Sequence, residues 1–220
     1  AIDETTFYPS KGKERLKSMI ETRPDWCVSR QRVWGVPLPI FINKKTGEIL
    51  IDNEVFDNIA KIYEKEGSDC WFSDDPQKFL GKKYKAEDFE KLSDIVEVWF
   101  DSGSTHSFVL EKRKDLKWPA SMYLEGSDQH RGWFHSSLLE SCGTRDRAPF
   151  ESILSHGFVV DGKGLKMSKS LGNVISPEDI LKKYGADILR IWVASSNYAE
   201  DLRIDLSLIH ISEPTRPSVI

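Results

Sequence analysis

The chain has 220 residues, 39% hydrophobic and 11% aromatic, enough to bury the core of one large domain or two modest ones. Its formal net charge of −4 argues against a general nucleic-acid binder, so we expect any nucleic-acid contact to be local. The three cysteines form no Cys-x-x-Cys pair, which indicates neither a zinc site nor a disulfide framework and favours reduced thiols in the cytosol. The sequence contains no signal peptide and no apolar run long enough to span a bilayer.

The first half of the chain alternates between polar and apolar segments. Residues 1–25 are polar and carry one helical stripe that ends before Pro24. Residues 26–42 are rich in apolar and aromatic side chains, which predicts a strand and a loop entering a buried sheet. Residues 43–93 are charged and mixed. They predict two short strands around a Thr46-Gly47 turn, the second over 49–51, and then a helix over about 53–66.

The second half predicts strands that lead into helices. Residues 94–100 and 122–124 are apolar strand candidates, and the second ends at a polar turn where a helix should begin and run to a stop at Gly143. Another helix should start at Ser176-Pro-Glu-Asp179, because Ser is a favoured N-cap, Pro fits the first helical position and acids suit the first turn. Gly185 should end it, and a further helix follows from about Asp187.

The polar turn after the strand at 122–124 is a candidate ligand site. In open α/β sheets ligands bind at strand ends, where helix N-termini offer unpaired N–H groups. Glu125 can accept a hydrogen bond from an ammonium group, Asp128 from a ribose hydroxyl, and Gln129 and His130 can reach an adenosine or a phosphate. Alternatively, Asp128 caps the helix, Glu125 pairs with an arginine, and Trp133 packs in the core.

Three lysines gather in a glycine-flanked loop within residues 156–173. Lys163, Lys166 and Lys169 can present mobile point charges to phosphate oxygens, or can form no more than a solvated hairpin tip. His156 before this loop can be a core histidine or a nucleotide contact. The polar cluster at residues 29–32 is equally compatible with a salt-bridged turn and with a contact to an RNA acceptor strand.

The order Lys166-Met167-Ser168-Lys169-Ser170 resembles the ATP loop of class I aminoacyl-tRNA synthetases. Together with residues 25–39, 94–106 and 123–134, it is similar to isoleucyl-tRNA synthetases over residues 1 to about 205. The valine and leucine relatives share the Ser-Arg-Gln and Lys-Met-Ser-Lys-Ser elements. The isoleucine assignment therefore rests on the segments around Trp99 and Glu125.

The resemblance implies an α/β fold, the second half of a Rossmann-type catalytic domain with a small α+β insertion. It implies activation of isoleucine with ATP, with Mg²⁺ carried by the substrate, and esterification of tRNA(Ile). Glu125 would bind the amino group of the adenylate, Lys166 and Lys169 would hold the ATP phosphates, and Trp99 and Trp133 would wall the isoleucine side chain. The other implied adenylate contacts are Gly126, Asp128, Gln129, His156, Met167, Ser168 and Ser170. It implies no metal or zinc site in this part of the protein.

The resemblance also divides the chain into six segments. They are an exit segment of an editing insertion (1–25), a return into the catalytic domain (26–45), a connective insertion (46–93), the second Rossmann half with the adenylate pocket (94–150), the lysine loop with its following helices (151–205), and a non-native tail (206–220).

Two departures limit what the chain should do alone. The family's first-half motif, His-x-Gly-His, is absent, and so is its editing domain apart from the exit segment at residues 1–25. The first residue is also not methionine, so we expect a partial chain that lacks the N-terminal half of its catalytic domain and is inactive by itself. The whole enzyme should be a cytoplasmic monomer without membrane contact. Alternatives are a valyl- or leucyl-tRNA synthetase fragment and a non-catalytic module that binds nucleotide or RNA.

Overall fold

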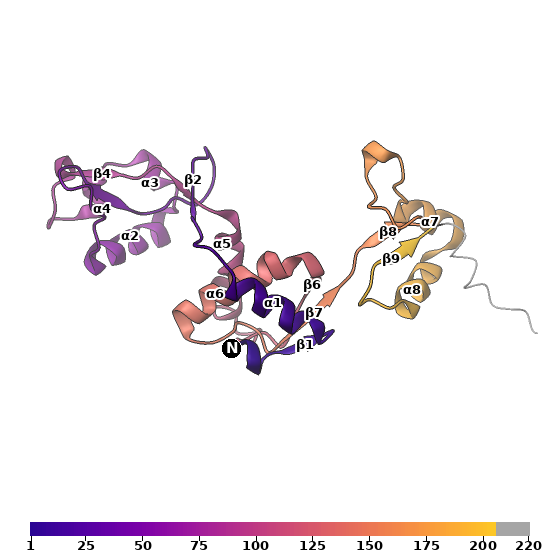
Figure 1. Cartoon of the computed structure of the whole chain (residues 1–220). Coiled ribbons are helices and arrows are strands. Elements are labelled where there is room, and N and C mark those ends of the chain that lie inside the picture. The colour runs from indigo at the N-terminus through magenta and orange to yellow at the C-terminus, as the bar shows by residue number, and fades with distance from the viewer. Residues whose placement is uncertain (206–220) are drawn as a thin grey trace, which may run out of the picture.

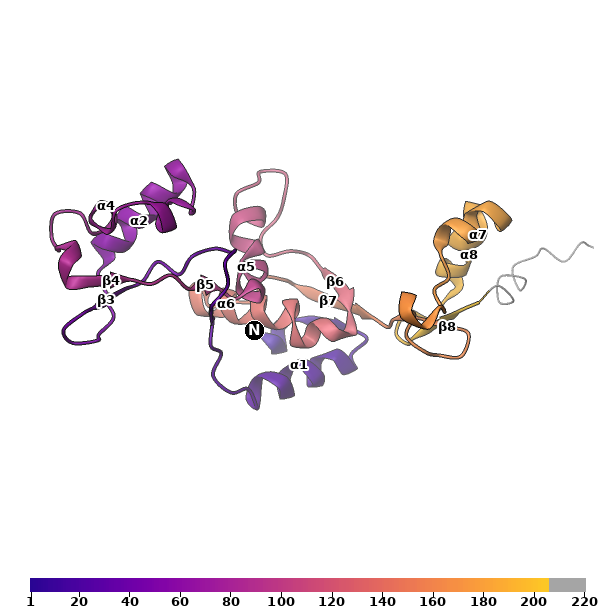
Figure 2. The same ribbon diagram turned by 90° about the horizontal axis from the view of Figure 1, so that it is seen from above.

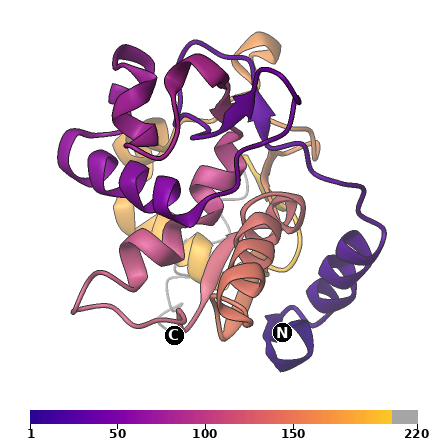
Figure 3. The ribbon, with the colours of Figure 1, turned by 90° about the vertical axis from the view of Figure 1, so that its left-hand side faces the viewer.

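The computed structural model describes residues 1–205, which form three lobes in a row (Figure 1). We call them the insertion lobe (residues 37–93), the central lobe (residues 1–30 and 94–156) and the lysine-loop lobe (residues 157–205). Each lobe has its own cluster of buried apolar side chains. The same row is seen from above in Figure 2 and from its insertion-lobe end in Figure 3. The expected non-native tail at 206–220 lies outside the described residues.

The central lobe is built on a parallel three-stranded sheet in the order β1-β7-β6. Its strands β6 (Tyr123–Gly126) and β7 (Ser152–His156) are joined through helix α6 (Trp133–Arg145), as parallel strands need a long crossover. Strand β1 (Thr6–Tyr8) lies on the other side of β7 and is followed by helix α1 (Lys11–Glu21). This βαβ unit confirms the predicted α/β fold class.

The core of the central lobe lies between this sheet and its helices. Leu16 of α1 and Phe134 of α6 are completely buried, and Ile153 of β7 is almost so. The remaining elements of the lobe are short: η1 (Ile2–Glu4), β2 (Ser29–Arg30), β5 (Ile95–Val96), α5 (Val98–Gly103), η3 (His106–Leu110) and η4 (Ser127–Arg131).

The prediction of a strand over residues 94–100 is wrong beyond its first part. Strand β5 pairs with β2 and ends at Val96, because the next side chain, Glu97, accepts a hydrogen bond from the Trp99 N–H and caps helix α5. The predicted stop at Gly143 is also wrong. Helix α6 continues to Arg145, and Asp146 adopts a left-handed φ of 56° just after it.

The insertion lobe packs three helices on a two-stranded antiparallel sheet, β3 (Phe41–Asn43) with β4 (Phe89–Lys91). Its helices are α2 (Asn53–Glu66), α3 (Cys70–Ser73) and α4 (Pro76–Leu80), with the short η2 (Ala86–Asp88) before β4. The predicted helix over 53–66 is confirmed, and the Asp52 carboxylate caps it by accepting from the Glu54 N–H at 2.9 Å. Trp71 is completely buried at the centre of this lobe.

Two strand predictions near the insertion lobe are wrong. Residues 49–51 form a single bridge between Ile49 and Ile42 and no strand. The apolar segment 26–42 does not lead into one buried sheet. It contributes β2 and the start of β3 to two separate two-stranded sheets, and Trp34 between them is 91% exposed. Residues 31–35 have no strand partner within residues 1–205, so the apolar side chains of Val33 and Trp34 stay exposed.

The lysine-loop lobe pairs β8 (Val159–Asp161) with β9 (Leu202–Ile204) in parallel. Between them come η5 (Lys169–Leu171), α7 (Pro177–Tyr184) and α8 (Ala186–Ser195). The predicted start at Ser176 is confirmed, since its hydroxyl accepts from the Glu178 N–H at 3.2 Å, and Gly185 ends α7 with a φ of 85°. Across residues 1–205 the structure contains no helix of the length and apolarity needed to cross a membrane.

Candidate active site at the strand ends and the lysine loop

The carboxyl ends of β6 and β7 lie side by side and carry several predicted site residues. Glu125 is in register with Ser155, and Gly126 with His156. Because β6 leads directly into η4, Asp128 follows at the same edge. A side-chain carbon at Gly126 would lie only 2.7 Å from Asp128 Oδ1, so this position has no room for one. The absence of a side chain at Gly126 therefore lets the Asp128 carboxylate pack closely against the end of β6.

The carboxylates at this edge are not neutralised by neighbouring cations. Glu125 is exposed, and within residues 1–205 it forms no ion pair; its Oε2 accepts only from the Gly126 N–H at 3.3 Å. Asp128 accepts from the Gln129 amide at 3.0 Å. The alternative that Asp128 caps the helix is wrong, because Gln129 Oε1 accepts from the Trp133 N–H at 2.9 Å and takes that role. Both carboxylates therefore keep acceptor capacity for a ligand.

Trp99 and Trp133 are close in the fold but face different surroundings. Trp99 lines a cavity of about 330 Å³ together with Glu97 and Gly132. Trp133 is not among its lining residues; its ring stacks on Tyr123 at 4.1 Å, and its Nε1 donates to the Ser102 carbonyl at 2.9 Å. Trp133 thereby ties α6 to α5, the helix that carries Trp99. A role of either ring in amino-acid binding stays a prediction.

The base of the lysine loop is held by Asp161 and Asn173. Asp161 Oδ1 accepts from the N–H groups of Lys163 and Leu165, and its Oδ2 accepts from the Asn173 amide at 2.8 Å. These hydrogen bonds, that of Asn173 first, hold the pKa of Asp161 below its usual value. Sequence reasoning missed both residues. An aspartate before Gly-x-Gly is the available signal, because Asp side chains commonly bond backbone N–H groups two residues on.

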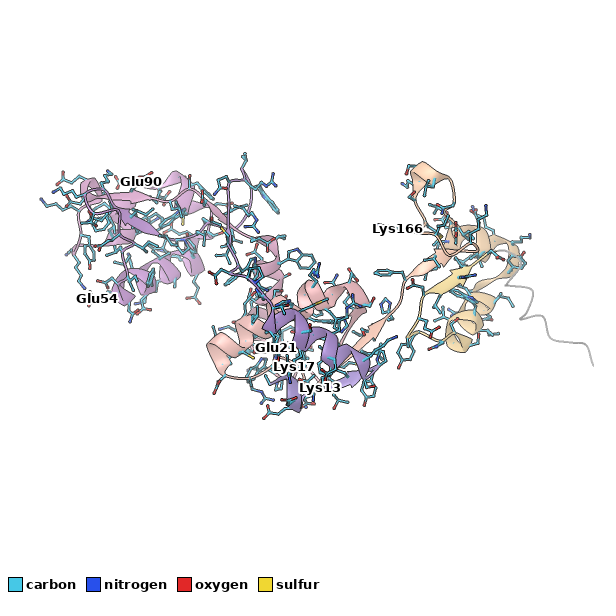
Figure 4. All side chains as sticks on the ribbon, in the orientation of Figure 1. Lys13, Lys17, Glu21, Glu54, Glu90 and Lys166 are labelled. Atoms are coloured by element: carbon cyan, nitrogen blue, oxygen red, sulfur yellow. The ribbon has the colours of Figure 1, made fainter. Side chains whose placement is uncertain are left out.

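Within the loop the predicted residues divide into anchors and free side chains. Ser168 donates its N–H to Asn173 Oδ1 at 2.9 Å, and its hydroxyl accepts from the Leu171 N–H. Met167 packs against the buried cluster of this lobe. Lys166 and Lys169 are exposed and, within residues 1–205, form no ion pair; Lys166 is labelled in Figure 4. The loop therefore presents these two ammonium groups on a hydrogen-bonded frame.

The structure does not bring all predicted residues into one place. Glu125, Gly126, Asp128 and His156 meet at the strand ends of the central lobe, whereas the lysines belong to the next lobe. His156 ends β7, and its Nδ1 lies 2.7 Å from the Gly157 carbonyl, at the junction of the two lobes. The chain passes from one part of the candidate site to the other through this junction.

The polar cluster at residues 29–32 is largely bound within the protein. Arg30 donates to the carbonyls of Cys27 and Ser29, each at 2.7 Å, and Gln31 donates to the Asp94 carboxylate at 2.8 Å. These contacts favour the structural alternative for Arg30 and Gln31. Residues 1–205 contain no group of three or more His, Cys, Asp or Glu side chains that could hold a metal ion.

The family model described as "tRNA synthetases class I (I, L, M and V)" matches residues 1–205. The chain belongs to this family. The isoleucine–tRNA ligase of Pelagibacter ubique (strain HTCC1062) is 84% identical over 95% of the chain, and that of Zymomonas mobilis is 56% identical over 95%. The chain spans only 23% and 22% of the length of these curated relatives.

Solved structures of this family share the fold. A leucyl-tRNA synthetase of Agrobacterium radiobacter K84, in a ternary complex with tRNA and LeuAMS, has a TM-score of 0.59 at 21% identity. That likeness covers 89% of this chain and 29% of the other. A methionyl-tRNA synthetase of Mycobacterium tuberculosis with methionyl-adenylate has a TM-score of 0.59 at 17% identity, covering 94% and 32%. The strand ends and the lysine loop thus belong to a class I synthetase fold.

Proposed function

We propose that this chain is part of an isoleucine–tRNA ligase, which activates isoleucine with ATP and transfers it to tRNA(Ile). The observation that carries the proposal is the 84% identity to one such enzyme across 95% of the chain. Two features support it: the Glu125 carboxylate at a parallel strand end and the two lysines on an anchored loop, none of which has an ion-pair partner among residues 1–205.

The reaction depends more on the positioning of the substrates and the stabilisation of charge than on covalent catalysis by the protein. The isoleucine carboxylate attacks the α-phosphorus of ATP, and pyrophosphate leaves. Glu125 would hold the ammonium group of isoleucine, and Gly126 and Asp128 would contact the adenylate at the strand end. Lys166 and Lys169 would meet the leaving phosphates as negative charge develops on them. Mg²⁺ would arrive with ATP as part of the substrate.

The choice among isoleucine, valine and leucine would depend on the Trp99 cavity. One methylene group is worth only about 1–3 kcal/mol of discrimination, so the cavity walls alone would separate these substrates weakly. The identity to isoleucine enzymes favours isoleucine over the valine and leucine alternatives.

The rest of the catalytic domain would dock on the free edge of β6. This strand is at the edge of a parallel sheet, yet Leu124 within it and Met122 just before it are 56% and 42% exposed. All-parallel sheets occur almost only with both faces covered, so further strands and helices are expected here. We propose that the whole enzyme is a cytoplasmic monomer and that this chain alone gives no isoleucine-dependent ATP–pyrophosphate exchange.

The proposal is tested by titrating the chain with non-hydrolysable sulfamoyl analogues of isoleucyl-, valyl- and leucyl-adenylate. We expect the isoleucyl analogue to bind most tightly, and Glu125→Gln to weaken it about tenfold or more, since a hydrogen bond to a charged group contributes roughly 1.5–3 kcal/mol. Glu178→Gln, an exposed change on α7, is the matched control and should leave binding unchanged.

Other outcomes separate the alternatives. Tighter binding of the valyl or leucyl analogue would reassign the amino acid. Binding of RNA without binding of any analogue would support a non-catalytic module. Equal affinity of the Glu125→Gln and unmodified chains for the isoleucyl analogue would remove the proposed role of Glu125.

A further inference from the structure

His130 belongs to the polar turn after β6, but its side chain is buried within the protein. The residue is 1% exposed, so it does not reach a ligand as its place beside Asp128 and Gln129 in the sequence suggested. Its Nδ1 lies 2.9 Å from the Ser127 carbonyl, and the ring stands edge-on to Phe134 with 5.5 Å between the ring centres. The imidazole therefore closes the turn η4 from the inside.

The two ring nitrogens of His130 have different surroundings. Burial lowers the pKa of His130, and the hydrogen bond to the Ser127 carbonyl opposes this only in part, so the ring is neutral at physiological pH. Because a carbonyl only accepts, Nδ1 carries the proton and donates to Ser127. Nε2 is then a bare acceptor, and within residues 1–205 it has no hydrogen-bond partner.

Helix α1 packs directly against this Nε2 at Gly12. A side-chain carbon at Gly12 would lie 3.0 Å from Nε2 of His130 and 3.4 Å from Cδ1 of Phe7. The first separation is tighter than side-chain carbons ordinarily adopt, and both rings are buried, so neither has free space to move into. Any residue other than glycine would therefore displace the His130 ring and the turn that it closes.

A second contact ties the chain just after α1 to the start of α6. Nη1 of Arg23 lies 2.9 Å from Nε2 of His135, and Arg23 forms no ion pair within residues 1–205. Burial, and then the charge of Arg23, lower the pKa of His135 to about 4, so at neutral pH its Nε2 accepts from the guanidinium. His135 also hydrogen-bonds the backbone of His130. The segment that contains α1 thus holds the turn and the following helix at two points.

We propose that His130 and Gly12 position Asp128 and Gln129 for the adenylate without touching it. The Nδ1–H of His130 fixes the Ser127 carbonyl at the start of the turn, and Gly12 leaves the room that the ring needs there. Side chains at a binding site keep a productive geometry when packing and hydrogen bonds behind them lock their backbone. The inference rests on the proposed function and adds two positioning residues to it.

Two substitutions of His130 separate a positioning role from a packing role. Asparagine can donate from Nδ2 near the place of Nδ1 and keep the bond to the Ser127 carbonyl, whereas leucine fills the space but cannot donate. In titrations of the full chain with the sulfamoyl analogue of isoleucyl-adenylate, we expect His130→Leu to weaken binding about tenfold and His130→Asn to recover most of that loss. A packing role predicts the opposite order, because leucine fills a buried space better than asparagine does.

Gly12→Ala tests the contact with α1. It should weaken binding of the analogue about threefold to tenfold, although alanine favours a helix, because the ring must move. Ser18→Ala, at an exposed position of the same helix, is the matched control and should leave binding unchanged. Gly12→Ala combined with His130→Asn should bind no more weakly than His130→Asn alone, since asparagine has no atom at the place of Nε2.

Nuclear magnetic resonance gives a readout that does not depend on a ligand. The imidazole nitrogen spectrum of the unmodified chain should show the His130 proton on Nδ1. The backbone amide signals of Asp128 and Gln129 should shift in Gly12→Ala and stay in place in Ser18→Ala. Chemical denaturation of each variant checks that it is folded.

The proposal is overturned if His130→Leu binds the analogue as tightly as His130→Asn, or if the proton lies on Nε2. It is also overturned if the amide signals of Asp128 and Gln129 are the same in Gly12→Ala and Ser18→Ala. The proposed function fails by a different result, the absence of analogue binding by the unmodified chain. In that case the amide signals still decide whether α1 positions the turn.

Discussion

At the scale of single residues, Glu140 on α6 is a half-buried acid with no cation partner in the described part of the chain. Its Oε1 has no hydrogen-bond partner within residues 1–205, and burial, followed by the charge of Asp101, raises its pKa from 4.5 to about 8. The folded state therefore keeps a proton that the unfolded state has released. The contribution of Glu140 to stability falls as the pH rises from about 4.5 to about 8 and is level above that.

Glu140→Gln should remove this decrease in the free energy of unfolding between pH 4.5 and about 8, because an amide stays neutral at every pH. We expect the free energy of unfolding at pH 8 to rise by about 1–2 kcal/mol relative to the unmodified chain, a value reduced for partial solvent access. Urea unfolding at pH 5, 6, 7 and 8 measures it, with the exposed Glu178→Gln as control. Parallel pH profiles for Glu140→Gln and the unmodified chain would contradict the assignment.

At the scale of secondary-structure elements, the crossing of α5 and α6 depends on a glycine. A side-chain carbon at Gly103 would clash with Glu140 Oε1 and lie 3.0 Å from Ser136 Oγ. Gly103→Ala should therefore separate the helices, cost about 1–3 kcal/mol of stability and displace Trp99 on α5.

Gly143→Ala in α6 is the matched control for this crossing. A side-chain carbon at Gly143 meets no atom within 4 Å, so alanine should gain up to about 1 kcal/mol from helix propensity. Chemical denaturation of both variants, with titration of the isoleucyl analogue, measures the pair. Similar changes in the free energy of unfolding of both variants would mean that the helix crossing at Gly103 can accommodate a side-chain carbon.

At the scale of the whole molecule, each lobe packs around a separate cluster of apolar side chains. Trp71 is fully buried in the insertion lobe, with Phe41 and Phe79 at ring distances of 5.1 and 4.9 Å, and it donates to the Leu92 carbonyl. Trp71→Ala should cost that lobe about 3–5 kcal/mol and leave the central sheet protected.

Hydrogen exchange of the backbone amides measures this independence. Protection should be lost in α2, β3 and β4 and kept in β6 and β7. Phe72→Ala, the adjacent but 46% exposed aromatic, should change protection little. Equal loss of protection in both lobes would show that they unfold as one unit.

Features that depend on neighbours in the chain were predictable. The start of α2 at Asp52 and that of α7 at Ser176 follow from side chains that bond a backbone N–H two residues on. The lysine loop was recognisable because its residue types and their order are local. The same locality explains an error, since the cap at Glu97 turned an apolar segment into a helix although its composition favours a strand.

Residue order alone was enough to specify the family, the positions of the capped helices and the residue types of the lysine loop, because each depends on contacts over a few residues. Only the tertiary structure could show that β1 pairs with β7, that Gln129 in place of Asp128 caps α6, and that Arg23 meets His135. The last contact joins residues 112 positions apart. Burial and unbalanced charge at such a contact arise from packing in space, which no local pattern encodes.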